Sequence, residues 1–182
     1  MRNSDGSLTV LTINPAMPAA QSGDIYCPYL AAADSANHVA VPVEALNHSS
    51  LQPSGAYQLA AYSADRSGNL STTSTYRNMP KVAVASVTSV SVSPSGKLLA
   101  VGGSAGLQVF HFNGSSPITH FTGLLTKDEV DQVAWDNDSH LYAISRSAGN
   151  LFVFTVTSTG CSQAAGSPYA IISPESVSVL PR

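Results

Sequence analysis

The chain repeats itself at an interval of 43–44 residues, and this repeat restricts the folds that it can adopt. The segment VTSVSVSPSGKLLAVGGSAG (87–106) aligns without a gap with VDQVAWDNDSHLYAISRSAG (130–149), so that Leu98 corresponds to Leu141. A more distant copy lies upstream in LAAADSANHVAVP (30–42). Within each copy apolar residues alternate with polar ones, and turn-forming residues separate the apolar runs. The repeat therefore predicts an all-β chain of equivalent units.

Units of this length that consist only of strands are typical of β-propeller blades. We expect residues 1–182 to form a single β-propeller region, in which each blade has four antiparallel strands. The expected parts are a partial outer strand at 1–20, complete blades at about 25–79, 80–126 and 127–169, and a terminal strand at 173–181.

A closed propeller needs at least about four blades, so three complete blades predict an incomplete or half propeller. Such an arc leaves apolar faces and strand edges uncovered, which favours self-association or pairing with a missing N-terminal half-propeller. The expected core consists of the recurring apolar positions Val90, Val92, Leu98, Val101, Val109, Phe110, Val133, Trp135, Leu141, Ile144, Val153 and Phe154.

The composition excludes some classes of protein. Only 10% of the residues are charged and the net charge is −3, which argues against a nucleic-acid partner. No apolar run is long enough for a membrane span. A surface rich in Ser and Thr and poor in charge favours an extracytoplasmic location, periplasmic or secreted. We expect no cofactor and no metal, and we expect the two cysteines, Cys27 and Cys161, to be free thiols.

The unit SPSGKLLAVGGSAGLQVF and the unit end TSTGCSQAAGSPYAI resemble the lactonase-type seven-bladed β-propellers with YVTN-like repeats. Blades of that family read roughly DPSGKFLYVAN, then VSVYTID, then GSPF. The resemblance implies the C-terminal half of such a propeller and a bacterial source. Some members open or form lactones, including phosphogluconolactonases, but no motif here allows their catalytic residues to be carried over.

Loops on one rim of a propeller usually contact the ligand, and the repeat places most of the scarce charged residues there. The insertion 43–56 between two strands of the first unit stands out. A carboxylate, an imidazole and a guanidinium could activate water and polarise a carbonyl, which makes Glu44, His48 and Arg146 the candidate catalytic residues. The alternative is that these residues form a solvated rim without a pocket. The remaining ligand-binding candidates on this rim are Asn47, Asp128, Glu129 and Glu175.

Two other features have structural alternatives. His111 and His120 flank the turn NGSSP and are expected to face each other across it, as an exposed pair without a third metal ligand. The glycine-rich GGSAG (102–106) opens no helix, so it fails the test for a phosphate-binding loop.

Three functions remain open. The first is a non-catalytic binding or scaffold propeller that presents its loops to a sugar or a protein. The second is a lactonase-type hydrolase that acts on a sugar lactone and resembles the 6-phosphogluconolactonases. The third is a truncated fragment without independent function. A Glu, a His and an Arg clustered around one water would favour the hydrolase, and a flat rim would favour the binding module.

Overall fold

The computed structural model describes residues 5, 7, 16–137 and 139–179, and all of its regular secondary structure is β-strand. This confirms the all-β prediction. The described part of the chain contains no helix that could cross a membrane. The first sheet contains β1 (Asp24–Pro28), β2 (Ala32–Ala33), β3 (His38–Asn47), β4 (Gln58–Ala64) and β5 (Leu70–Ser71).

Two further antiparallel sheets follow in chain order. The second sheet contains β6 (Val87–Val92), β7 (Leu98–Gly103), β8 (Gly106–His111) and β9 (Thr119–Thr126). The third contains β10 (Gln132–Asp136), β11 (His140–Ser145), β12 (Asn150–Thr157), β13 (Gly160–Gln163) and β14 (Tyr169–Ala170).

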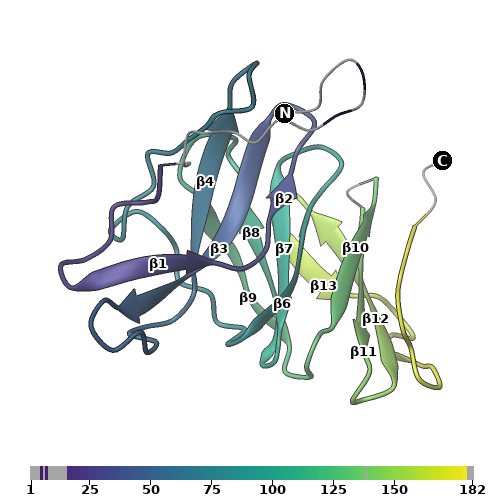
Figure 1. Cartoon of the computed structure of the whole chain (residues 1–182). Helices are drawn as coiled ribbons and strands as arrows, with labels where there is room; N and C mark the ends of the chain where they lie inside the picture. Colours follow the sequence, from purple (N-terminus) through teal and green to yellow (C-terminus); the bar gives the residue numbers. More distant parts are fainter. Residues whose placement is uncertain (1–4, 6, 8–15, 138, 180–182) are drawn as a thin grey trace.

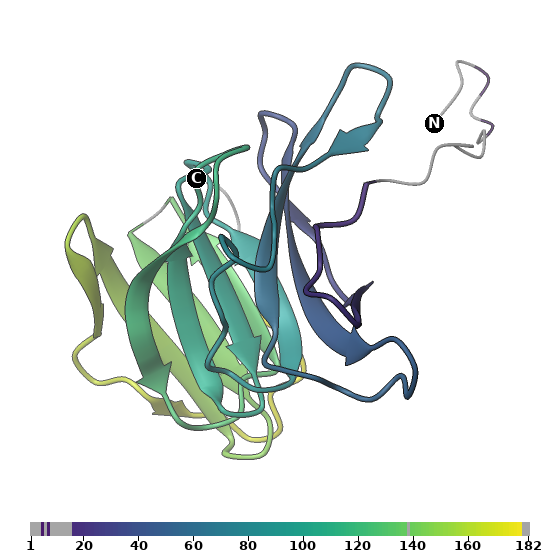
Figure 2. The same ribbon diagram turned by 90° about the vertical axis from the view of Figure 1, so that its left-hand side faces the viewer.

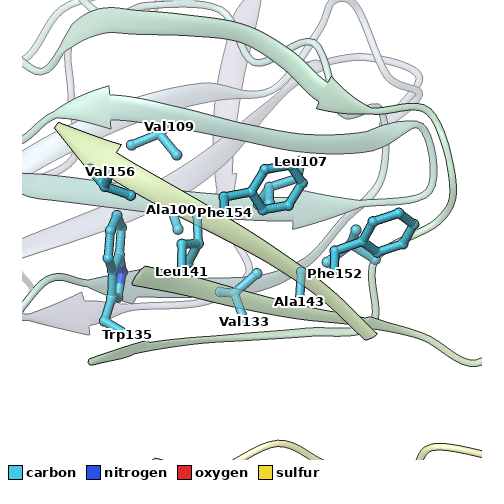
Figure 3. Packing of buried hydrophobic residues seen from close by; sticks show 11 residues of the cluster. Ala100, Leu107, Val109, Val133, Trp135, Leu141, Ala143, Phe152, Phe154 and Val156 are labelled. Carbon is cyan, nitrogen blue, oxygen red and sulfur yellow. The ribbon is translucent and has the colours of Figure 1, made fainter. Parts of the chain in front are cut away.

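The three sheets pack in a row, with the second between the other two (Figures 1 and 2). One apolar cluster joins the first sheet to the second and includes Leu59, Leu99 and Phe110. Another joins the second sheet to the third, and Figure 3 shows Leu107 and Val109 of the second sheet facing the side chains of β10–β12. Each of these sheets is therefore held in place mainly by the apolar side chains between it and its neighbour.

Polar contacts fix how the third sheet lies on the second. The indole Nε1 of Trp135 donates a hydrogen bond to the Ser91 carbonyl at 3.0 Å. The backbone N–H of Val133 donates to Ser89 Oγ at 3.2 Å. Both bonds run from β10 to β6, so the first strands of the two sheets lie next to each other, and the buried indole has a partner for its only donor.

The predicted core is largely present. Of its twelve members, Val101, Val109, Phe110, Val133, Trp135, Leu141, Ile144 and Phe154 are buried. The other four, Val90, Val92, Leu98 and Val153, are half-buried.

The strand pairing corrects the gapless alignment of the last two units. Val92 lies opposite Leu99 in the second sheet, and Trp135 lies opposite Leu141 in the third. Leu141 therefore corresponds to Leu99, and not to Leu98 as the alignment had it, because the turn between the two strands is one residue shorter in the third sheet. A one-residue slip exchanges the faces of a strand, so this correction decides which residues meet the neighbouring sheet.

The structure bears differently on the two predicted terminal strands. The partial outer strand at 1–20 lies mostly outside the described residues; within it, Ala19 forms one isolated bridge with Thr75. The terminal strand expected at 173–181 is wrong for residues 173–179, which belong to no sheet. The Val177 N–H donates a hydrogen bond of 2.9 Å to the Gln132 side chain on β10. Pairing within a sheet requires hydrogen bonds between backbone groups instead.

An aspartate and a histidine close the same turn in the first and the third sheet. Asp34 Oδ1 accepts the His38 N–H at 2.8 Å, and Asp136 Oδ1 accepts the His140 N–H at 2.7 Å. The second carboxylate oxygen lies 2.8 Å from the Nδ1 atom of His38 and 3.0 Å from that of His140. Both histidines are thereby held inside the turn, where they have a structural role.

Replacement of Asp34 by asparagine is expected to lower the free energy of unfolding at pH 7 by about 1–2 kcal/mol, because its bonds to His38 lose their charge assistance. Burial raises the pKa of the Asp34 carboxyl, but bonds from His38 and Ala36 outweigh this and hold it below its ordinary 3.8. The wild-type contribution is therefore present above pH 3.8 and is lost as the pH falls through the lower folded pKa.

Urea titrations at a series of pH values between 2 and 7 measure this effect. Asp34→Asn should unfold with a shallower acid dependence than the wild-type chain. Asp128→Asn, which changes an exposed carboxylate in the loop after β9, is the control and should keep the wild-type profile. An acid dependence that Asp34→Asn leaves unaltered contradicts the role given to this turn.

Candidate functional site

Strand β3 extends beyond the point at which the sequence predicted a loop. It continues from Val43 to Asn47 because β1 pairs with this stretch, with Cys27 opposite Glu44. The insertion 43–56 is therefore a strand extension followed by a loop, and Glu44 lies on a strand. This corrects the predicted loop position of Glu44.

The extension gathers two tyrosines around Glu44, and we call these three residues the Tyr29–Glu44–Tyr57 cluster. The Tyr29 hydroxyl donates a hydrogen bond of 2.7 Å to Glu44 Oε2. The two tyrosine rings meet edge to face, with centroids 5.4 Å apart and an angle of 66° between their planes. Tyr29 is 52% exposed, whereas Glu44 and Tyr57 are half-buried. The cluster thus combines an exposed aromatic ring with a partly shielded carboxylate.

The Glu44 carboxylate raises the pKa of both tyrosines. The pKa of Tyr29 is raised well above its ordinary value, first because its hydroxyl donates to Glu44, and then because Tyr57 lies close by. Burial raises the pKa of Tyr57, and the negative charge of Glu44 raises it further. Both hydroxyls therefore keep their protons at neutral pH; the Tyr29 proton is donated to Glu44, and the Tyr29 oxygen can still accept a hydrogen bond.

The surrounding backbone holds the cluster in place. The Tyr29 N–H donates to the Pro42 carbonyl at 3.3 Å, and the Tyr57 carbonyl accepts the Val82 N–H at 2.8 Å. The Tyr57 ring also packs against the apolar cluster between the first and second sheets. A rigid support of this kind lowers the entropy lost when a ligand binds.

Two more predicted residues follow Glu44 in the chain. Asn47 Oδ1 accepts the N–H groups of Ser49 and Ser50, each at 3.0 Å, and so shapes the turn after β3. The backbone N–H of His48 donates to the Gly23 carbonyl at 2.8 Å, and the residue is exposed. Asn47 therefore has a turn-forming role, as asparagine often does.

Arg146, in the turn after β11, and Glu175, in the segment after β14, lie together beside the third sheet. The Arg146 guanidinium donates to the Glu175 carbonyl at 3.1 Å and lies 3.8 Å from the Glu175 carboxylate. The Asp131 carboxylate accepts the Arg146 N–H at 2.7 Å. The Arg146 and Glu175 side chains are 55% and 81% exposed, so this ion pair contributes little to stability. These contacts connect the segment after β14 to the turn after β11.

The remaining predicted residues are not drawn into a site. Asp128 is exposed and Glu129 is half-exposed in the loop after β9, and neither forms an ion pair within the described residues. His111 and His120 do not face each other: His111 contacts Phe121, while His120 contacts Phe110. The prediction that they face each other is therefore wrong. Phe110, and not His111, lies opposite His120, so the two histidines lie on opposite faces of the sheet.

The structure therefore divides the candidates between two sheets. Glu44 and Asn47 belong to the first sheet and His48 lies in the turn that follows β3, whereas Arg146 and Glu175 lie beside the third sheet. Tyr29 and Tyr57 were missed by the sequence reasoning, because only the pairing of β1 with β3 and of β3 with β4 brings them to Glu44.

The cysteines fit the prediction. Cys27 and Cys161 are free thiols, which confirms that they form no disulfide. Burial raises the pKa of Cys161 to about 11, so this thiol stays protonated and unreactive at neutral pH.

No protein-family model matches this chain, and no curated protein matches it in sequence.

Proposed function

We propose that this chain is a non-catalytic β-propeller module, related to the lactonase-type propellers, and that it binds a sugar at the Tyr29–Glu44–Tyr57 cluster. Support for the propeller comes from the 43–44-residue sequence repeat, the three successive antiparallel sheets and the Asp–His turn found in two of them. Support for binding comes from the cluster itself.

The chemistry of the cluster suits a polyhydroxylated ligand. A carboxylate accepts hydrogen bonds from neighbouring hydroxyl groups, and a tyrosine hydroxyl can both donate and accept. An exposed tyrosine ring adds a rigid surface for the C–H face of a sugar and has little rotamer entropy to lose. The observation that carries the proposal is the 2.7 Å bond from Tyr29 to Glu44, which fixes an aromatic ring beside an anion at the surface.

Lactone hydrolysis has less geometric support. Glu44 lies on β3 of the first sheet and His48 in the turn after it, whereas the candidate cation Arg146 lies in the turn after β11 of the third sheet, and the second sheet packs between these two sheets. Arg146 is also engaged by Asp131 and Glu175. A general base and an oxyanion-stabilising group must act on the same substrate atoms, which favours the binding function over the hydrolase.

Binding of the purified chain to a panel of immobilised saccharides, followed by calorimetry with the best one, tests this proposal. Tyr29→Ala and Glu44→Gln should each weaken binding at least about tenfold, because the first removes the aromatic ring and the second removes the negative charge. Tyr169→Ala, which removes a similarly exposed tyrosine from the third sheet, should leave the affinity unchanged. Circular dichroism checks that each variant is folded.

Two results contradict the proposal. One is that the folded wild-type chain binds no saccharide of the panel. The other is that Tyr169→Ala weakens binding as strongly as Tyr29→Ala does.

A further inference from the structure

A cavity of about 400 Å³ lies between the second and the third sheet, far along the chain from the Tyr29–Glu44–Tyr57 cluster. It is lined by the turn before β7, by side chains of β8 and β9, and by the end of β12 with the turn that follows. Its volume lies within the range of pockets that bind small organic molecules.

The matching corner between the first and second sheets is filled. There the His38 ring lies against the turn after β8, so closely that a Cβ added to Gly114 would be 3.1 Å from it. The His38 carbonyl accepts the Asp34 N–H at 3.0 Å, and the Leu98 carbonyl accepts the Ser93 N–H at 2.8 Å. Leu98 therefore takes the position of His38 in the second sheet. No imidazole occupies that position there, and Leu98 instead lines the open cavity. The two sheet junctions thus differ at this position.

Part of the cavity lining is apolar. Leu98 and Phe121 are half-buried and pack against the cluster between the second and third sheets, and Val156 belongs to that cluster. These side chains can cover a compact apolar body, such as a single ring, and keep it from water.

Hydrogen-bond donors lie beside these apolar side chains, since His111 pairs with Leu98 across β7 and β8. Lys97 is exposed and forms no ion pair within the described residues. The His111 ring packs against Phe121, with centroids 4.4 Å apart, and its nitrogens have no hydrogen-bond partner in the described part of the chain. Ser158 also lines the cavity. The described lining residues include no carboxylate, and Lys97, His111 and Ser158 each bring a hydrogen-bond donor to the lining.

We propose that this cavity binds a small organic anion, in which a carboxylate or phosphate group contacts Lys97 and His111 and a compact apolar body covers Leu98, Phe121 and Val156. The apolar and the polar lining residues account for the two halves of the ligand. The inference does not depend on the sugar site, which lies on the first sheet.

Titration of the ¹⁵N-labelled chain with benzoate and with phenyl phosphate, followed through assigned backbone amides, tests this site. Both probes should shift the amides of Lys97, Leu98, His111 and Thr157 in a saturable way, with a dissociation constant of about 1 mM or tighter. Benzyl alcohol lacks the charge and inorganic phosphate lacks the apolar body, so each should bind at least about tenfold more weakly.

Three variants test the polar lining residues. Lys97→Met should weaken benzoate binding about tenfold, whereas Lys127→Met, which removes an exposed lysine after β9, should not change it. His111→Phe keeps a ring against Phe121 and removes the nitrogen donors, so it should weaken benzoate binding and leave benzyl alcohol binding as it was.

The proposal is overturned if neither probe gives saturable shifts at these amides. It is also overturned if benzyl alcohol binds as tightly as benzoate, or if Lys127→Met has the same effect as Lys97→Met.

Discussion

Phe154→Ala is expected to lower the free energy of unfolding by about 3–5 kcal/mol, which is a large part of the stability of a domain of this size. The Phe154 side chain is 1% exposed and lies between the second and third sheets (Figure 3). Its strand neighbour is Leu141, which is fully buried. Truncation removes the apolar burial of the ring and leaves a cavity that two rigid sheets can fill only in part.

Urea denaturation followed by circular dichroism measures this loss. The denaturant dependence of the free energy should stay the same while the midpoint falls. Ile172→Ala is the control, because the Ile172 side chain is 98% exposed and its loss should change stability by less than about 0.5 kcal/mol. A loss below about 1 kcal/mol for Phe154→Ala contradicts the packing of the third sheet on the second.

The same position is aromatic in each sheet, and this explains why the sequence was informative about the core. Tyr62 lies opposite Val39, Phe110 opposite Leu99, and Phe154 opposite Leu141. All three aromatic residues are buried. Alternation with a period of two assigns such residues to one face of a strand without knowledge of the neighbouring sheet.

The exact register could not be read from the sequence. The turn of the third sheet has one residue fewer than that of the second, and turn residues carry no hydrophobic pattern that would reveal a deletion. An alignment without a gap therefore placed Leu141 on Leu98 and exchanged the faces of β11. Only the pairing of Trp135 with Leu141 decides the register.

The candidate site was harder to predict than the core. Glu44 was selected from the sequence as a scarce charge in an insertion, and this reasoning could not foresee its position on a strand. Its tyrosine neighbours lie 15 and 13 residues away in the chain, so their contact depends on long-range pairing. Arg146 was chosen for the same reason as Glu44 and lies in the turn after β11. The repeat assigns both residues to one rim, but it does not require rim residues of different units to approach each other.

Gly106→Ala is expected to lower the free energy of unfolding by about 3 kcal/mol or more, since two independent penalties add. Gly106 opens β8 with a φ of +131°, a backbone conformation that residues with a Cβ rarely adopt. A Cβ there would lie 2.0 Å from the Thr126 carbonyl oxygen, which is a backbone atom and cannot rotate away. Gly106 is thus needed for the close backbone packing between β8 and β9.

Gly123→Ala is the matched control for this prediction. Gly123 lies in β9, in the same sheet, and a Cβ added to it would meet no atom within 4 Å. Its replacement should change stability by less than about 1 kcal/mol, because an added methyl group in open space costs little and restricts the unfolded chain. Urea denaturation of both variants separates the two cases. Equal stabilities for Gly106→Ala and Gly123→Ala would mean that β8 and β9 approach each other less closely than the structure shows.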